Sequence, residues 1–228
     1  MENKFTYLFL DAVTIIGPLV LSFDKKVAFY RKWKYFFLSM LPVSLFYIIW
    51  DILFTETGIW KFNSEFLLGT NFINLPIEEY LFFIVVPYSC LFIYACLKAY
   101  FPNLKIKGSL WFYPLLLLSM FMTVFYYHKI YTVVTFGILA TVLFFLLFKE
   151  KSLLNHIGSH LFLSWIIALL PMAYVNGILT SKPVLIYNNM ENCRLRIGTI
   201  PFEDFFYNLL YMTLMIVIYE KLKKTETN

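Results

Sequence analysis

Residues 74–83 read NLPIEEYLFF, and residues 199–206 read TIPFEDFF, with the two prolines 125 positions apart. Each stretch places a proline and two adjacent acids at the start of a strongly apolar segment, and an asparagine (Asn63 or Asn188) lies 13 positions before each proline. A carboxylate at the mouth of a membrane span costs free energy, so two matching pairs call for a functional explanation. We interpret them as paired acid–base chemistry on an apolar molecule.

The composition is that of an integral membrane protein. Of the 228 residues, 61% are hydrophobic, 21% are aromatic and only 14% are charged, and the mean hydropathy is +0.71. A soluble domain of this size does not need so much apolar surface. The net charge of +5 comes from basic residues in short loops, so we expect no nucleic-acid partner.

The apolar pattern predicts an all-α, polytopic membrane protein with seven transmembrane helices. We place them at about 5–22, 34–53, 77–98, 109–126, 130–148, 159–179 and 202–220. Adding 125 to the first three ranges gives the last three within a few residues, which predicts two parallel three-helix repeats. The first unit covers residues 1–100, the linking helix 101–128 and the second unit 129–228.

The basic residues predict the orientation in the membrane. Thirteen of the 19 Lys and Arg residues lie after the first, third and fifth spans or at the C-terminus. The positive-inside rule then puts the C-terminus in the cytoplasm and the N-terminus outside, with both acid pairs on the outer side. We expect the protein in a bacterial inner membrane.

The acid pairs suit acid–base chemistry. Proline fits the first helical turn, and the acids that follow lie where the helix dipole favours an anion. Neighbouring residues on a helix point about 100° apart, so Glu78 and Glu79 are not expected to share a pocket, and neither are Glu203 and Asp204. Helix capping would explain one such pair, but two matching copies favour catalysis. A buried carboxyl beside a better solvated one supplies an acid and a base.

Asp51 is expected at the outer end of the second span, and its counterpart 125 positions later is Asn176. Aromatic side chains near the acids could hold a polyene and stabilise a carbocation through their π faces. His156 and His160 have no evident third ligand, so we predict no metal site. The sequence has no Gly-rich nucleotide loop, so no cofactor is evident, and a requirement for reduced flavin or NAD(P)H stays open.

The chain resembles the membrane-integral lycopene cyclase domain family, found as bacterial heterodimers and as the cyclase part of fungal bifunctional carotenoid enzymes. In that family each three-helix unit carries an aromatic–Asn loop with a tryptophan, followed by a Pro-x-Glu-Glu/Asp motif. Residues 58–63 (GIWKFN) and 76–83 (PIEEYLFF) match this pattern well, and residues 186–188 (IYN) and 201–206 (PFEDFF) match it more loosely. The resemblance covers nearly the whole chain, with both units fused.

The resemblance implies a lycopene cyclase, expected to be of the β type, which turns the linear ψ end groups of lycopene into rings without net redox change. The reaction needs proton addition, closure of a tertiary cation on a neighbouring double bond, and proton removal. The expected catalytic residues are Glu78, Glu79, Glu203, Asp204 and Asp51. Glu78 is the expected proton donor, and Glu79 or Asp51 the base or orienting group. The expected substrate-binding residues are Trp60, Asn63, Asn188, Phe82 and Tyr207.

The second unit departs from the family pattern, because Leu185 stands in place of Trp60 and Asn176 in place of Asp51. This favours the first unit as the catalytic one. The expected partners are lycopene, the lipid bilayer and a possible second copy of the chain. The alternative is a small proton-coupled transporter that uses the acids as a relay, although the apolar centres of the spans favour a lipophilic substrate.

Overall fold

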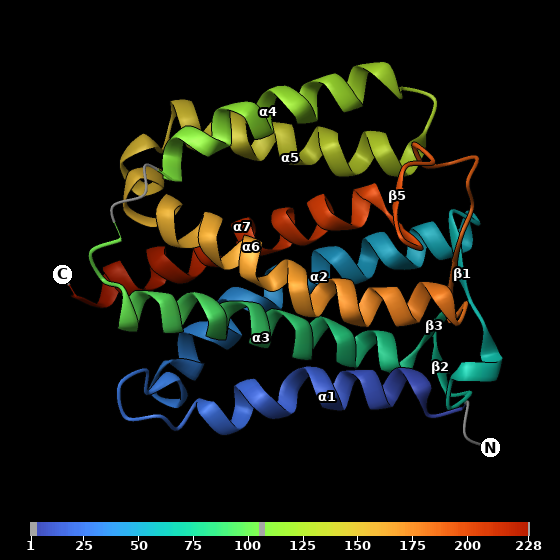
Figure 1. The fold of residues 1–228 in the computed structure, drawn as a ribbon, viewed down its shortest axis with the longest axis horizontal. Coiled ribbons are helices and arrows are strands. Elements are labelled where there is room, and N and C mark those ends of the chain that lie inside the picture. The colour runs from blue at the N-terminus through green and yellow to red at the C-terminus, as the bar shows by residue number, and fades with distance from the viewer. Residues whose placement is uncertain (1–3, 105–107, 228) are drawn as a thin grey trace.

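In the computed structural model, which describes residues 4–104 and 108–227, the helices run side by side as one bundle (Figure 1). They are α1 (Thr6–Leu21), α2 (Trp33–Glu56), α3 (Ile77–Tyr100), α4 (Gly108–Phe125), α5 (Ile130–Phe148), α6 (Lys151–Ser181) and α7 (Phe202–Thr227). The predicted all-α class and the seven predicted helices are confirmed. A short 3-10 helix, η1 (Phe29–Lys32), leads into α2.

Five helices, α2, α3, α5, α6 and α7, are long and apolar enough to cross a membrane, whereas α1 and the described part of α4 are apolar but shorter. Large apolar side chains also cover the outside of the bundle, as at Leu117, Val124 and Leu170. Both features are typical of a membrane protein. Helix α6 begins well before its predicted span, because the first turns (residues 151–158, KSLLNHIG) mix polar and apolar residues and hydropathy marks only the apolar part of the helix.

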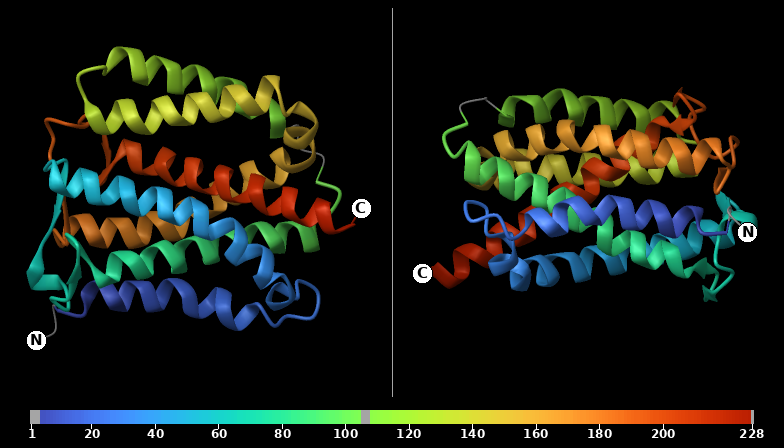
Figure 2. Two further views of the ribbon diagram at one scale, coloured as in Figure 1. Left: turned by 180° about the vertical axis from the view of Figure 1, so that it is seen from behind. Right: turned by 60° about the horizontal axis from the view of Figure 1, so that its bottom comes forward.

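The ends of the bundle differ. The N-terminal end of α1 and the loops before α3 and α7 lie at one end, and the C-terminus lies at the other (Figures 1 and 2). Both acid pairs therefore lie at the same end of the bundle. Lys105 and Lys107, which contribute to the predicted orientation, lie outside the described residues.

Two of the prolines inside the helices, Pro18 and Pro87, are compensated by hydrogen bonds between helices. A proline leaves the carbonyl group four residues earlier without its usual N–H partner. Pro18 in α1 frees the carbonyl of Thr14, which accepts a hydrogen bond from the hydroxyl of Ser89 in α3 (2.9 Å). Pro87 in α3 frees the carbonyl of Phe83, which accepts one from a serine hydroxyl of α2 (2.8 Å). These bonds tie α3 to both of its neighbours in the first half of the chain.

Short strands shape the two long loops, and the sequence did not predict them. They are β1 (Trp60–Phe62), β2 (Asn71–Phe72) and β3 (Leu75–Pro76) in the first loop, and β4 (Leu185–Tyr187), β5 (Arg196–Ile197) and β6 (Ile200–Pro201) in the second. The first loop also contains the 3-10 helix η2 (Ser64–Phe66). Strands β2 and β3 form one tight antiparallel pair, and β5 and β6 form another.

The two loops also pair with each other. Strands β1 and β4 are antiparallel, with Trp60 opposite Tyr187. The backbone N–H of Asn63 donates to the carbonyl of Val184 (2.9 Å), and the N–H of Asn188 donates to the carbonyl of Ile59 (2.8 Å). Adding 125 to the number of Asn63 and subtracting 125 from that of Val184 gives Asn188 and Ile59, the partners of the second bond. The offset found in the sequence therefore also relates these backbone hydrogen bonds. The loops thus form a joint cover over one end of the bundle.

Candidate active site

One cavity of about 330 Å³ lies beneath these loops, with walls from α1, α3, α6 and α7. Its lining is mainly apolar, but it includes the carboxyl groups of Asp51 (α2), Glu79 (α3) and Asp204 (α7). All three residues are buried. A largely apolar cavity with a few convergent polar groups is the usual form of a small-molecule site. The cavity therefore joins acids from both halves of the chain.

The carboxyl groups of Asp51 and Glu79 are close neighbours in the buried lining of the cavity, and we call them the acid pair. The hydroxyl of Tyr7 donates to Oε2 of Glu79 (2.5 Å), and Nε1 of Trp60 donates to Oδ1 of Asp51 (2.6 Å). Among the described residues, no N–H or hydroxyl donor reaches Oδ2 of Asp51. Two neighbouring carboxyl groups that are shielded from water cannot both be ionised without a large electrostatic cost, so one of them keeps its proton. The acid pair therefore holds a proton beside the cavity.

Asp204 has a different environment. Its carboxylate accepts hydrogen bonds from the hydroxyls of Tyr131 (2.6 Å) and Tyr187 (2.9 Å) and from Nδ2 of Asn176 (3.2 Å). Hydrogen bonds from neutral donors favour the ionised form of a carboxyl group. Tyr187 lies in β4, outside the helices, where burial first and the charge of Asp204 second raise its pKa well above 10. Its phenol therefore remains a hydrogen-bond donor at physiological pH.

Glu78 and Glu203 do not line the cavity. Oε1 of Glu78 accepts the backbone N–H of Leu68 (2.7 Å), and Oε1 of Glu203 accepts that of Cys193 (2.7 Å), again 125 positions apart. The hydroxyl of Thr132 also donates to Glu203 (2.5 Å). In each motif one acid thus faces the cavity while the acid before it anchors the loop. Burial and the nearby Glu203 raise the pKa of Cys193 to about 12, so this thiol is not a nucleophile near neutral pH.

The residues expected to bind substrate fall into two groups. Trp60, Phe82 and Tyr207 line the cavity, whereas Asn63 and Asn188 do not. The side-chain oxygen of each asparagine instead accepts the backbone N–H two residues further on, at 3.1 Å and 3.0 Å. Such Asx turns fix the local path of a chain. The two asparagines therefore shape the loops that carry the aromatic residues.

Aromatic rings form a wall between the acid pair and Asp204. The ring of Trp60 lies 5.2 Å from that of Tyr131 and 5.9 Å from that of Tyr187, centroid to centroid. The rings of Tyr131 and Tyr187 are stacked, with centroids 5.8 Å apart. The π faces of such rings attract a cation, most strongly where water is excluded. The site can thus hold a proton, a positive charge and a proton acceptor in one apolar space.

The sequence did not single out Tyr7 and Tyr131, which hold Glu79 and Asp204 in matching ways. These tyrosines are 124 positions apart, one fewer than the acids they bind. A comparison of the two halves that allowed a one-residue shift in the first helix would have paired them. Within residues 4–104 and 108–227, no group of three or more His, Cys, Asp or Glu side chains is arranged to hold a metal ion.

A family model described as lycopene cyclase matches residues 4–97 and 128–222, which is most of the chain. The chain belongs to the lycopene cyclase family. Comparison with curated proteins and with solved structures gives no match. The two matched segments contain α1–α3 and α5–α7, and α4 lies between them. In this member of the lycopene cyclase family, acids from both matched segments line the same cavity.

Proposed function

We propose that this chain is a β-type lycopene cyclase, an isomerase that closes the linear ψ end groups of lycopene into rings. The observation that supports this most directly is the apolar cavity shared by Asp51, Glu79 and Asp204. The reaction needs a proton donor, a shielded cation and a proton acceptor, and each has a candidate in this cavity.

The acid pair is the proposed proton donor. It adds a proton to the terminal double bond of the end group, which leaves a tertiary cation on the substrate and one more negative charge on the pair. Tyr7 and Trp60 remain hydrogen-bonded to Glu79 and Asp51, so they stabilise this charge as it develops. This assignment replaces Glu78, the donor expected from the sequence, because Glu78 binds the backbone of its own loop.

Ring closure follows within the aromatic wall. The neighbouring double bond attacks the cation, a carbon–carbon bond forms, and the positive charge moves onto the new ring. The faces of Trp60, Tyr131 and Tyr187 stabilise the charge, and the apolar lining keeps out water that would otherwise trap the cation. No oxidant or reductant takes part, so we propose no cofactor for these steps.

Asp204 is the proposed base. It removes a proton from a ring carbon, and the electrons of that carbon–hydrogen bond form the ring double bond and neutralise the cation. One proton has been added and one removed, so the product is an isomer of the substrate. The next turnover requires the proton to return from Asp204 to the acid pair. General acid–base catalysis by positioned groups of this kind contributes about 10²–10⁴-fold in rate.

The setting of the site is also part of the proposal. We infer that all seven helices cross a bacterial inner membrane, with the N-terminus and the acids on the outer side. The acids of the cavity come from the first turns of α3 and α7 and the last turns of α2, next to the loops, and the rest of the lining is largely apolar. A proton-coupled transporter would need polar groups along its path through the bilayer, so this lining favours the cyclase.

The test is pigment analysis of a lycopene-accumulating bacterium that expresses the chain alone. Wild type should convert lycopene to a product with β rings, whereas Glu79→Gln and Asp204→Asn should leave lycopene unchanged. Glu65→Gln is the matched control, because Glu65 is an exposed acid of the first loop that does not line the cavity. Unchanged lycopene with wild-type protein shown to be inserted in the membrane would overturn the proposal.

A further inference from the structure

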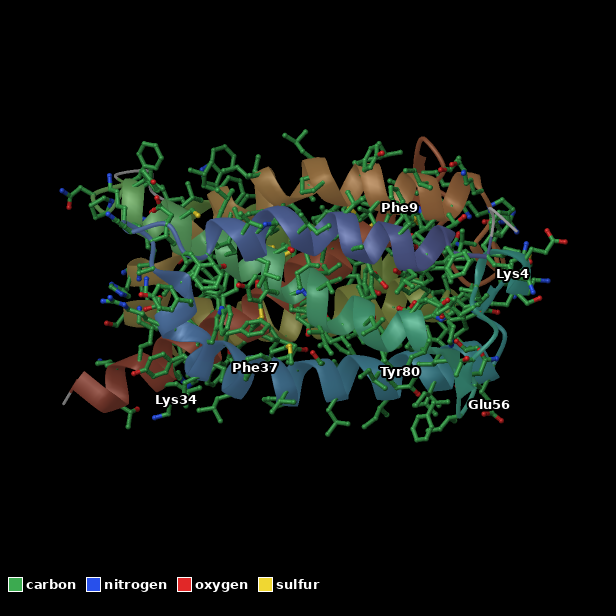
Figure 3. All side chains as sticks on the ribbon, turned by 90° about the horizontal axis from the view of Figure 1, so that it is seen from below. Lys4, Phe9, Lys34, Phe37, Glu56 and Tyr80 are labelled. Atoms are coloured by element: carbon green, nitrogen blue, oxygen red, sulfur yellow. The ribbon has the colours of Figure 1, made fainter. Side chains whose placement is uncertain are left out.

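The cavity reaches the outside of the bundle between two helices. Of the side chains that line it, those exposed at the surface are Val13 of α1 and Pro171 and Tyr174 of α6. Every other lining residue is buried or half-buried. Helices α1 and α6 therefore frame the opening, and they lie next to each other in the view from below (Figure 3).

The opening lies away from the loops. Nearer to the loops, Tyr7 and Leu10 of α1 belong to the same buried cluster as Val175 and Leu179 of α6. The two helices are thus in contact beside the acids. About one turn further along, Val13 is exposed, so the helices separate there and the cavity meets the surface. The acids are closed off from the loop end but accessible from the side.

The surface around the opening is apolar. The exposed neighbours on α1 are Phe9, Ile16 and Val20, and those on α6 are Ile167 and Leu170. An exposed apolar band of this kind on a membrane protein faces the hydrocarbon of the bilayer. The opening therefore leads into lipid, where a carotenoid is dissolved.

The cavity has one acidic end. Asp51, Glu79 and Asp204 gather beneath the loops, while Pro18, Ile93 and other apolar residues line the part further from the loops. The two end groups of a linear carotenoid are separated by the whole polyene. While one end group lies at the acids, the other cannot reach them.

We infer that the carotenoid enters sideways from the bilayer between α1 and α6, and that one end group is cyclised per binding event while the rest of the polyene stays in lipid. This inference rests on the proposed cyclase function. The site then recognises one ψ end group and is insensitive to the far end, so linear, monocyclic and longer carotenoids are all substrates. A product with two rings requires two separate binding events.

The first test uses the wild-type protein in liposomes and needs no variant. The substrate is a carotenoid with a ψ end group at one end and a bulky ester at the other, compared with lycopene. We expect the ψ end of the ester substrate to close at an initial rate within about threefold of the rate with lycopene, because the far end of either substrate lies outside the site. With lycopene, the one-ring product should appear first and then decline. Rejection of the bulky substrate, or a two-ring product without a one-ring precursor, would overturn the inference.

The second test narrows the opening. Val13→Trp should lower the initial rate with lycopene about tenfold or more. The larger side chain narrows the opening, so a passing polyene makes overpacked contacts, which have effects of this size. Leu45→Trp is the matched control, because Leu45 is an exposed aliphatic residue of α2 that neither lines the cavity nor flanks the opening. Both variants are first checked for membrane insertion and thermal stability. Equal rates in two well-folded variants would overturn the route between α1 and α6.

The two proposals fail in different ways. If wild type forms no ring from any ψ end group, the proposed function is wrong, and this inference is wrong with it. If wild type is active but Val13→Trp behaves like Leu45→Trp, or the bulky far end is rejected, only the lateral route is wrong.

Discussion

The two halves of the molecule build the same framework and put different chemistry on it. In the first half, Glu79 lies beside a second buried acid, Asp51, and like-charge repulsion keeps one proton on the two. In the second half, Asn176 takes the place of that acid, and Asp204 is surrounded by neutral donors. The backbone bonds of the loops match at an offset of 125 residues. In the proposed reaction, equal frameworks with unequal side chains give one site a proton to donate and the other a group to accept it.

The comparison also explains why the proposed reaction needs both halves of the chain. A carboxyl group in an apolar space can serve as an acid or a base according to its surroundings. The loops pair through β1 and β4, which brings Trp60 beside Tyr131 and Tyr187. The proposed proton donor, the acid pair, and the proposed acceptor, Asp204, therefore face the same cavity.

The largest expected effect comes from removing either end of this arrangement. Glu79→Gln and Asp204→Asn should each lower the initial rate of ring formation by about 10²–10⁴-fold, the usual contribution of a positioned acid or base. The rate is measured with purified protein in liposomes, and Glu65→Gln serves as the control. If either variant kept half of the wild-type rate, the role assigned to that residue would be wrong.

The next prediction makes the two sites alike. Asp51→Asn gives the first site the amide found in the second, so Glu79 loses its carboxyl partner and the rate should fall about 100-fold. An infrared band of a protonated carboxyl should be lost from the same variant, and this readout does not depend on turnover. The reciprocal change, Asn176→Asp, gives Asp204 a carboxyl partner and should cost about tenfold as the base becomes shared.

Persistence of the carboxyl band in Asp51→Asn would contradict a proton shared with Glu79. Wild-type turnover in both variants would mean that the contrast between the two sites has no part in the reaction. The double variant, which exchanges Asp51 and Asn176, separates a reversal of roles from simple damage, because a reversible arrangement should regain part of the lost rate.

A third prediction concerns the acids that face the loops. Glu78→Ala leaves the N–H of Leu68 without its acceptor, and a buried unsatisfied donor costs about 1–3 kcal/mol. Glu203→Ala should cost more, because Glu203 accepts bonds from both Cys193 and Thr132. We expect lower thermal stability in detergent but nearly normal turnover per folded molecule.

The glutamine variants are the controls, since an amide oxygen still accepts the backbone N–H and should restore most of the stability. A Glu78→Gln protein that is stable but inactive would return the proton-donor role to Glu78. It would also break the comparison, since the first acid of the motif would then act in catalysis rather than in the loop.

Much of the fold follows from the sequence because hydrocarbon imposes simple rules on it. Span length and motif spacing predict seven apolar segments and the 125-residue offset. They also predict that both proline–acid–acid motifs lie at one end of the bundle. The strands β1 and β4 could not be predicted, because their pairing depends on how two distant loops meet. The tyrosines Tyr7 and Tyr131 were missed because they deviate from the repeat by one residue.

Within the motif, the sequence predicted that adjacent acids point in different directions but not which of them faces the cavity. That depends on the rotation of α3 and α7 about their axes, which the low helical amphipathicity of membrane spans does not reveal. The structure places Glu79 and Asp204 at the cavity, and it places Glu78 and Glu203 at the backbone of their loops.

The smallest expected effect separates the tyrosines of the two sites. Tyr7 is the hydroxyl donor to Glu79, so Tyr7→Phe should lower the rate about tenfold, whereas Tyr187→Phe leaves Asp204 with two other donors and should cost about threefold. Titration tests the second case further, because burial raises the pKa of Tyr187 well above 10. A raised pKa keeps the phenol neutral, so its contribution to stability is complete below pH 10 and is lost only as the pH rises through the higher value. The neutral phenol also keeps donating to Asp204 during turnover, so wild type should keep its roughly threefold advantage in rate over Tyr187→Phe from pH 7 to about pH 10. A loss of that advantage in rate near pH 9 would mean that the phenol ionises as in water. Asp204 would then lack the dry surroundings that distinguish it as the proposed base.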